Sequence, residues 1–213
     1  LLSMSSEDDP ALLQAIRELS CAAVVVDRDI APELPRVVSD HQEGLEDAVR
    51  QLIDLGHRRI ALINGTPDLR PSVERTIAFR RACRAGQAKA VVRDGYLGRD
   101  HGYETTVKLL ASPDQPTAII VGGNQVLKGV LEAVRDAKRK VPRDLSLISC
   151  DDVSLSEFLA PPLATIVRDT EELGRTAAEL LLDVIDGGKP KRLVLSTSFR
   201  SAASCGRAPS RAV

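Results

Sequence analysis

Two hydrophobic patterns follow one another in residues 45–65 and indicate the expected architecture. Apolar residues recur every three or four positions in residues 45–53, which predicts an amphipathic helix. Residues 60–63 are apolar without alternation, as expected for a strand that is covered on both faces. Gly56 lies between them, where the end of a helix favours a residue that can adopt positive φ. The stretch therefore predicts a helix that leads into a buried parallel strand.

The same succession of helical and strand patterns recurs along the chain without a sequence repeat. Helices are expected to begin near Pro10, Ser72, Asp100, Asn124 and Glu171, and strands to occupy residues 22–26, 37–38, 90–92, 117–121, 145–149, 165–167 and 193–197. Asn124 is expected to cap its helix, and the polar residues 201–213 to form a frayed tail. The alternation predicts an α/β fold with a parallel, doubly wound sheet.

Polar residues and glycines follow several of the predicted strands. Asp27, Asn64, Gly122 and Asp151 each lie at or just after the carboxyl end of an apolar run. Parallel sheets of this kind bind ligands beyond the carboxyl ends of their strands. The sequence therefore predicts a polar pocket that is built from several loops.

Charge and cysteine content exclude some classes of protein. The net charge is -1 and the pI is about 6.4, so this chain taken alone shows no sign of binding nucleic acid. The four cysteines are scattered without a CxxC spacing, which favours reduced thiols over a disulfide or a metal site. No apolar run is long enough to span a membrane and no signal peptide opens the chain, so we expect a cytoplasmic protein. We also expect no metal and no cofactor.

Several segments, in order along the chain, resemble the LacI/GalR family of transcription regulators, specifically their effector-binding core. The matching segments are VVVDR at 24–28, VVSDHQEGLEDAVRQLIDLGHRRIALING at 37–65, SVERTIAFRRAC at 72–83, PTAIIVGGNQVLKGVLEAV at 116–134, VPRDLSLISCDD at 141–152 and APPLATIVRDTEELGRTAAELLLDVIDG at 160–187. The resemblance implies a periplasmic binding protein type I-like fold. Two Rossmann-like subdomains with parallel sheets would be joined by three crossings, near Ser39, Val167–Arg168 and Leu195–Ser196.

The resemblance also implies where the subdomains begin and end. The N-terminal subdomain would comprise residues 1–39 plus 168–195, the C-terminal one residues 40–167 plus 196–206, and residues 207–213 would form a tail. The DNA-binding headpiece of the family and the first strand and helix of its core have no counterpart in this chain. The junction between Leu19 and Cys21 is also shorter than in the family.

The function implied by the resemblance is that of the ligand-sensing, dimerising core of a bacterial repressor. A small-molecule effector, a sugar or another polar metabolite, would bind between the subdomains and change the affinity for operator DNA. The DNA would be bound through an N-terminal helix-turn-helix that this chain does not contain. A homodimer is expected, with the helix at Val126–Val134 and the loop after Asp152 as candidate contacts, although the apolar helix face would equally cover the sheet.

Two other classes of function remain open at this point. A periplasmic solute-binding protein of an ABC transporter would have the same fold. An enzyme on a Rossmann-like fold is less favoured, because the chain has no GxGxxG turn, P-loop or ordered pair of nucleophile and base.

Three charged residues are the main candidates for effector binding. Asp27 matches a family position that accepts hydrogen bonds from effector hydroxyls, but it could instead cap a helix or pair with Arg28. Arg75 matches an effector-binding arginine, and its guanidinium offers a planar fork for hydroxyls, carboxylates or phosphates. The alternative for Arg75 is a solvated charge in the first turn of its helix. Asp151 matches an effector-binding aspartate and requires a partner, either ligand hydroxyls or an arginine such as Arg75.

The remaining candidate positions depart from the family or leave two roles open. Leu97 lies where many members carry an aromatic that stacks on the ligand, and Gly123 where sugar-binding members carry Asn. These departures argue for a polar non-sugar ligand or for weak sugar binding. Gly123 and Asn124 could instead present helix amides to an anionic group or form a plain turn. Ser72 could cap its helix or donate to a ligand, and Arg168 could reach the cleft or the opposite subdomain.

Overall fold

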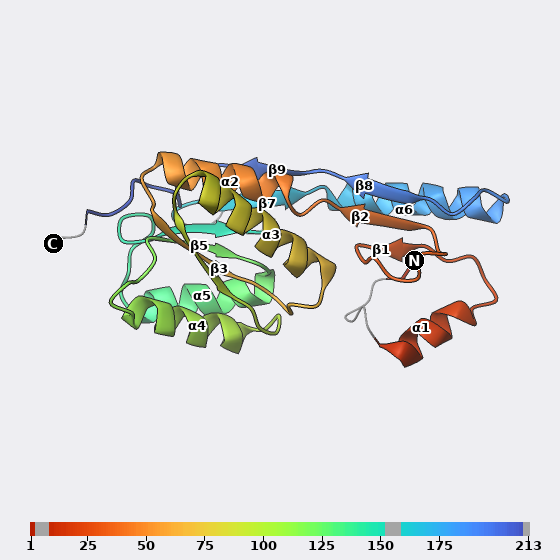
Figure 1. Cartoon of the computed structure of the whole chain (residues 1–213), viewed down its shortest axis with the longest axis horizontal. Coiled ribbons are helices and arrows are strands. Elements are labelled where there is room, and N and C mark those ends of the chain that lie inside the picture. The colour runs from red at the N-terminus through yellow and green to blue at the C-terminus, as the bar shows by residue number, and fades with distance from the viewer. Residues whose placement is uncertain (3–8, 152–158, 211–213) are drawn as a thin grey trace.

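The strands of the molecule form two separate sheets, which lie side by side along its length (Figure 1). The computed structural model describes residues 1–2, 9–151 and 159–210. The smaller sheet has the order β1-β2-β8 and is parallel throughout. Its strands are β1 (Val25–Val26), β2 (Arg36–Ser39) and β8 (Arg192–Leu195).

The larger sheet has the order β4-β3-β5-β6-β7-β9 and is parallel except at one edge. Its strands are β3 (Arg59–Ile63), β4 (Lys89–Arg93), β5 (Ala118–Val121), β6 (Ser146–Ser149), β7 (Ala164–Arg168) and β9 (Thr197–Arg200). The final strand, β9, runs antiparallel to β7. The expected α/β class with two parallel-sheet units is confirmed, with this edge strand as the exception.

The chain passes between the two sheets three times among the described elements. It leaves the smaller sheet after β2 and continues into α2 (Glu43–Asp54), which packs against the larger one. It returns from β7 to α6 (Thr170–Ile185), and it crosses again from β8 to β9. The passages lie side by side, because Ser39 at the end of β2 pairs with Leu195 of β8, and Arg168 at the end of β7 pairs with Thr197 of β9.

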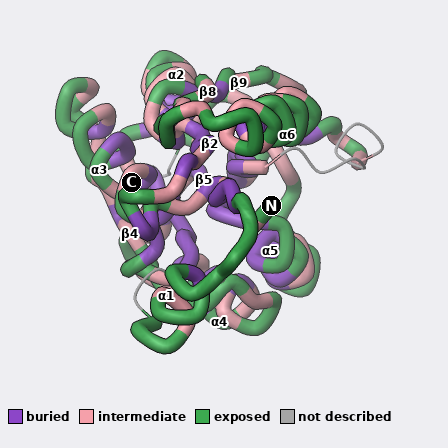
Figure 2. Tube along the Cα trace, turned by 90° about the vertical axis from the view of Figure 1, so that its right-hand side faces the viewer, coloured by how far each residue is buried: buried purple, intermediate pink, exposed green. Residues whose placement is uncertain are grey.

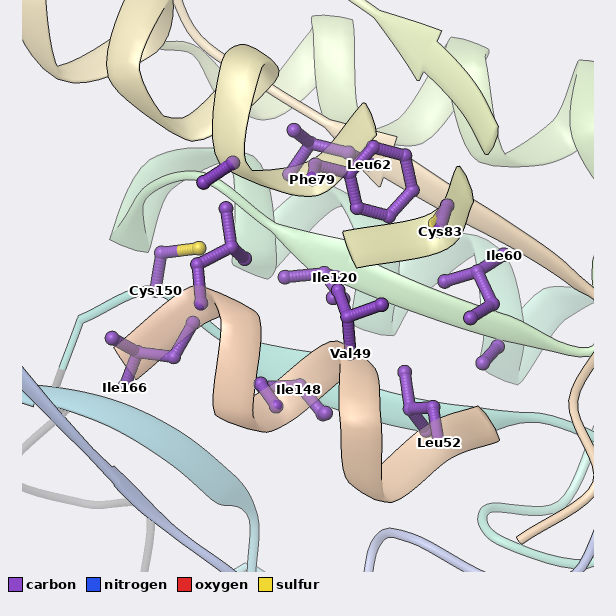
Figure 3. Packing of buried hydrophobic residues seen from close by; sticks show 14 of the residues in the cluster. Val49, Leu52, Ile60, Leu62, Phe79, Cys83, Ile120, Ile148, Cys150 and Ile166 are labelled. Carbon is purple, nitrogen blue, oxygen red and sulfur yellow. The ribbon is translucent and has the colours of Figure 1, made fainter. Parts of the chain in front are cut away.

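The larger sheet is covered by helices on both faces. On one face lie α2 and α3 (Arg70–Ala85), which enclose the core shown in Figure 3; Phe79, Leu52 and the sheet residue Ile120 belong to this cluster. On the other face lie α4 (Arg99–Ala111) and α5 (Asn124–Asp136). Burial on both faces explains why these strands read as uninterrupted apolar runs.

The smaller sheet has a smaller core. Helix α6 packs against one face through Leu173, Ala177 and Leu180. Helix α1 (Pro10–Arg17) contributes Ile16 to a second cluster on β1. Figure 2 shows that buried positions follow the strands, whereas the outer side of α6 is exposed.

The helix and strand predicted from residues 45–65 form as expected. Gly56 follows α2 with φ +91°, and Arg58 donates to the carbonyl of Ile53 at 2.8 Å. His57, in the turn between the helix and the strand, is fully buried. Its ring contacts the hydroxyls of Thr117 at 2.8 Å and Ser146 at 3.0 Å. These hydrogen bonds of the His57 ring therefore hold the turn against the larger sheet.

Three local expectations were wrong. Residues 193–197 form two strands in different sheets, because the chain crosses between the sheets at Ser196. Gly123 is the N-cap of α5, so Asn124 is its first helical residue and does not cap it. Ser72 is the third residue of α3 and also does not cap its helix, because α3 begins at Arg70.

The carboxyl-terminal segment is packed rather than frayed through residue 208. Ser204 is fully buried; its hydroxyl donates to the carbonyl of Leu147 at 2.6 Å and accepts from the amide of Ala164 at 2.8 Å. Further along, the amide of Ala208 donates to the carbonyl of Leu55 at 2.9 Å. The segment thus fastens β6, β7 and α2 together, and residues 211–213 lie outside the described part.

The apolar face of α5 does not form the expected dimer contact. Val126, Val130 and Val134 are buried in the core beneath the larger sheet, so this face is occupied within one chain. Close packing of α4 on α5 adds to that burial, since a Cβ on Gly129 would lie 1.9 Å from the carbonyl oxygen of Arg99. The other candidate contact, the loop after Asp152, lies outside the described residues.

We expect Ser204→Ala to lower the free energy of unfolding by about 2 kcal/mol, because it leaves a buried amide and a buried carbonyl without their partner. Ser201→Ala is the matched control, because Ser201 is exposed in the same segment, and it should change stability by less than about 0.5 kcal/mol. Urea denaturation measures both. Equal effects of the two substitutions would contradict the packed arrangement of this segment.

Candidate functional site

A cavity of about 230 Å³ lies where the carboxyl ends of strands from both sheets meet. It is lined by Asp27, Arg28, Leu69, Pro71, Ser72, Arg75, Leu97, Gly122, Gly123, Asn124, Gln125, Asp151 and Arg168. All eight residues proposed from the sequence are among them. Their convergence on one cavity is an observation, whereas their use in ligand binding stays a prediction.

Arg168 joins carboxylates from the two sheets across this cavity. It ends β7, donates from Nε to Asp151 at 2.9 Å and from Nη1 to Asp27 at 2.7 Å. Asp27 follows β1 of the smaller sheet, and Asp151 follows β6 of the larger one. The sequence left open whether Arg168 reaches the cleft or the opposite unit, and the geometry shows that it does both.

Besides Arg168, a backbone amide and two basic side chains surround the carboxylate of Asp27. Its Oδ1 accepts from the amide of Ser39 at 3.1 Å and lies 3.4 Å from Nε2 of His41 and 3.5 Å from Arg70. Burial raises the pKa of Asp27, but the bond and charge of His41, the charge of Arg168 and the Ser39 amide outweigh it, so the pKa is well below its usual value. The carboxylate therefore stays ionised although only 8% of the residue is exposed.

The alternatives considered for Asp27 do not apply. It caps no helix, and Arg28 donates to its backbone carbonyl at 2.7 Å rather than to its carboxylate. Asp27 has φ +56°, a left-handed conformation that aspartate tolerates better than most residues. This backbone turn follows β1 directly and positions the carboxylate at the cavity.

Arg75 is buried without an acidic partner. Only 6% of the residue is exposed, and its Nη1 donates to the carbonyl of Gly122 at 2.9 Å. Within the described ranges, no carboxylate lies within 4.0 Å of its guanidinium. The proposed pairing of Arg75 with Asp151 was wrong, because Asp151 pairs with Arg168. Arg75 also lies in the second turn of α3 rather than the first.

The first turn of α5 forms another wall of the cavity. Gly123, Asn124 and Gln125 line it, and no side chain among the described residues caps this helix. Leu97 packs nearby, since a Cβ on Gly123 would lie 3.1 Å from its Cδ2. The neighbouring Tyr96 does not line the cavity; its ring lies tilted against that of His101, with 5.9 Å between the ring centroids.

Asn64 connects the strand ends to the start of α3. Its side-chain amide donates to the carbonyl of Ser72 at 2.9 Å and to the hydroxyl of Thr76 at 3.1 Å. A Cβ on Gly122 would lie 2.8 Å from Oδ1 of Asn64, so these two strand ends require a glycine at this point. The contact fixes the position of Gly122, whose carbonyl in turn binds Arg75.

Sequence reasoning missed several members of the site. His41 and Arg70 contact Asp27 but lie 14 and 43 positions further along the chain, so no local pattern connects them with it. Gln125 lies next to the proposed Asn124, and adjacency to a helix N-terminus could have identified it.

The described residues show no other centre of chemistry. No group of three or more potential metal ligands was found among them. Burial raises the pKa of the Cys150 thiol, which lies directly before Asp151, to about 11, so this cysteine is a poor nucleophile. In the described ranges, no helix is both long and apolar enough to cross a membrane.

Comparison with known proteins gives a consistent set of likenesses. The model of the periplasmic binding protein-like domain matches residues 49–205. The probable HTH-type transcriptional repressor ExuR of Bacillus subtilis is 27% identical over 93% of this chain and 62% of its own length. The chain thus spans less than two thirds of the length of the curated relatives it first matches.

Solved structures agree with this result. A LacI transcriptional regulator from a Rhodococcus species superimposes with a TM-score of 0.87 at 30% identity, over 96% of this chain and 77% of that one. A LacI family transcriptional regulator from Enterococcus faecium, solved with bound ribose, gives 0.79 at 25% identity, over 86% and 70%.

The Arg168–Asp151 pair should show strong energetic coupling, because both groups are mostly buried and joined by a charge-assisted bond. In a double-mutant cycle of Arg168→Gln and Asp151→Asn, we expect a coupling of about 1–3 kcal/mol in the free energy of unfolding. The exposed pair Arg50–Asp47, with the same substitutions, is the control and should give less than about 0.5 kcal/mol. Urea denaturation of the seven proteins measures both couplings, and similar values for the two pairs would contradict strong coupling within the buried pair.

Acidification should destabilise the fold through His41. Burial lowers the pKa of His41, as do the charges of Arg75 and Arg168, although the bond and charge of Asp27 act in the opposite direction. The unfolded chain, with a histidine pKa of about 6.5, therefore binds more protons below that pH than the folded one. Each such histidine contributes a loss of up to about 1.4 kcal/mol per pH unit within that window.

The measurement is the free energy of unfolding at pH 7.5, 6.5 and 5.5. The free energy of unfolding should decrease as the pH is lowered, and it should decrease less steeply in His41→Gln. Some slope should persist in the variant, because burial also lowers the pKa of His57. An unchanged slope in His41→Gln would show that His41 does not contribute.

Proposed function

Because the chain belongs to the periplasmic binding protein-like family, in the form of the LacI/GalR effector-binding core, we propose that it senses a small molecule for a transcriptional repressor. The observation that carries this proposal is the cavity between the two sheets, where Asp27, Arg75 and Asp151 converge. The effector would contact Asp27 on one unit and Arg75 and Asp151 on the other. A ligand that spans both units binds one relative arrangement better than another, which is how it shifts their equilibrium.

Family likeness favours a regulator over the alternative of a transporter's solute-binding protein. Among the relatives and solved structures compared above, the names describe transcriptional regulators. We therefore propose a non-enzymic role in the cytoplasm. Ribose in the Enterococcus faecium structure supports a small polar effector for this cavity.

The partner of the intact protein would be operator DNA. DNA contact would be made by an N-terminal helix-turn-helix outside these 213 residues, in a homodimer that matches two half-sites of the operator. We propose that the subdomains comprise residues 1–39 plus 168–195 and residues 40–167 plus 196–206. Closure of one on the other would change the separation of the two DNA-binding units.

A thermal-shift screen of sugars and polar metabolites should identify compounds that raise the melting temperature. Arg75→Gln should abolish the shift for every such compound, because Arg75 is buried at the cavity and free of carboxylate partners in the described chain. Arg80→Gln is the matched control: it makes the same change on the exposed side of the same helix and should leave the shift intact. A shift that persists in Arg75→Gln would place the binding site elsewhere.

A further inference from the structure

We propose that the effector carries an anionic group, a carboxylate or a phosphate, held between Arg75 and the first-turn amides of α5. This inference rests on the proposed function and deepens it by assigning a chemical class to the ligand. It depends on how charge is distributed in the cavity, which differs between its two sides.

The side formed by Asp27, Asp151 and Arg168 is already satisfied. Arg168 binds both carboxylates at 2.7–2.9 Å, and Asp27 accepts in addition from the Ser39 amide. A ligand that approaches this side meets two carboxylates that share the guanidinium of Arg168 and already accept hydrogen bonds within the protein. These groups can bind ligand hydroxyls, but they create no demand for a charged ligand.

Arg75, by contrast, is a buried cation that no described carboxylate contacts. Arg75 is 6% exposed and has one hydrogen bond, to the Gly122 carbonyl, within the described part of the chain. A buried charge that lacks a counter-ion is costly, and a guanidinium has five donors to satisfy. The same cation lowers the pKa of His41, which shows that its charge acts on its buried neighbours. An anion at this point would relieve the imbalance.

Backbone donors converge on the same side. The helix α5 begins at Asn124, directly after Gly123, and neither its N-cap nor any other described side chain accepts from its first amides. Asn124 and Gln125 line the cavity together with Arg75. The positive end of a helix and a buried guanidinium facing one cavity form a site suited to an oxyanion.

The rest of the lining is poorly suited to a neutral sugar ring. No aromatic residue lines the cavity among the described residues, and Leu97 provides the apolar surface instead. Recognition of a neutral ring would therefore have to rely on hydroxyl contacts alone. A ligand with one charged group and a polar body matches both sides of the cavity.

The experiment compares matched ligands with the full chain. Glucose, glucuronate and glucose 6-phosphate form one series, and glycerol, glycerate and glycerol 3-phosphate form another; binding is measured by thermal shift and calorimetry at two salt concentrations. At least one anionic member should bind at least tenfold more tightly than its neutral parent and weaken with salt. The carboxylate and phosphate members distinguish the two classes of anion.

Variants then test the two halves of the anion site. Arg75→Gln should lower the affinity of the anionic member at least tenfold, whereas Arg80→Gln should not. Asn124→Pro removes the first amide donor of α5 at a helical position that tolerates proline, and Gly123 is already extended as the residue before a proline requires. Asn124→Ala keeps the amide and removes the side chain, so it measures the share of the side chain; the proline variant should weaken the anion more than the alanine variant does.

Equal binding of neutral and anionic members, still abolished by Arg75→Gln, would overturn the anionic class but leave the proposed function in place. Binding that is unaffected by Arg75→Gln would overturn both. Both would also be overturned if no member of either series binds and no compound in the metabolite screen raises the melting temperature. Loss of anion affinity in Arg75→Gln, with Arg80→Gln unchanged, and a greater loss in Asn124→Pro than in Asn124→Ala support the inference.

Discussion

The central interaction between the two units is that of Arg168, which binds an aspartate from each. Arg168 is the last residue of β7, so it lies where the chain leaves the larger sheet, and its guanidinium reaches Asp151 and Asp27 at once. Charged groups that are mostly buried are unfavourable unless they are paired, so removal of one partner destabilises the others. The ion pair therefore favours the relative position of the sheets in which all three groups are satisfied.

Arg168 joins two packed units rather than a flexible loop. In the larger sheet, the parallel strands are buried on both faces, and Gly122 is in close contact with Asn64, which in turn holds the start of α3. Small shifts within such a packed unit are unfavourable. Changes in the site are therefore expected to be relieved between the units, at the three chain crossings, and not within them.

Much of this architecture follows from apolar patterns, and the exceptions have identifiable physical causes. Uninterrupted apolar runs predicted the strands because these strands are covered on both faces, and the Gly56 turn followed from helix-end chemistry. The antiparallel edge strand β9 and the buried Ser204 were missed, because their partners are supplied by segments far away in the sequence. The polarity of these residues suggested that they are exposed to solvent. In the structure, buried backbone groups of neighbouring strands need a hydrogen-bond partner, and a hydroxyl or a histidine provides it.

The site shows the same division between local and distant information. Each of the eight candidate residues follows a strand or opens a helix, and the rule for the carboxyl ends of parallel strands was enough to bring them to one cavity. The ion pairs within the cavity were not predictable from the sequence. Both Arg75 and Arg168 could lie near Asp151 in an α/β fold, and their positions in the chain do not show which of them binds it. The pairing that forms has a chemical consequence. Because Arg168 binds both aspartates, Arg75 is a buried cation without a carboxylate partner in the described chain. This cation is what makes an anionic group on the ligand favourable.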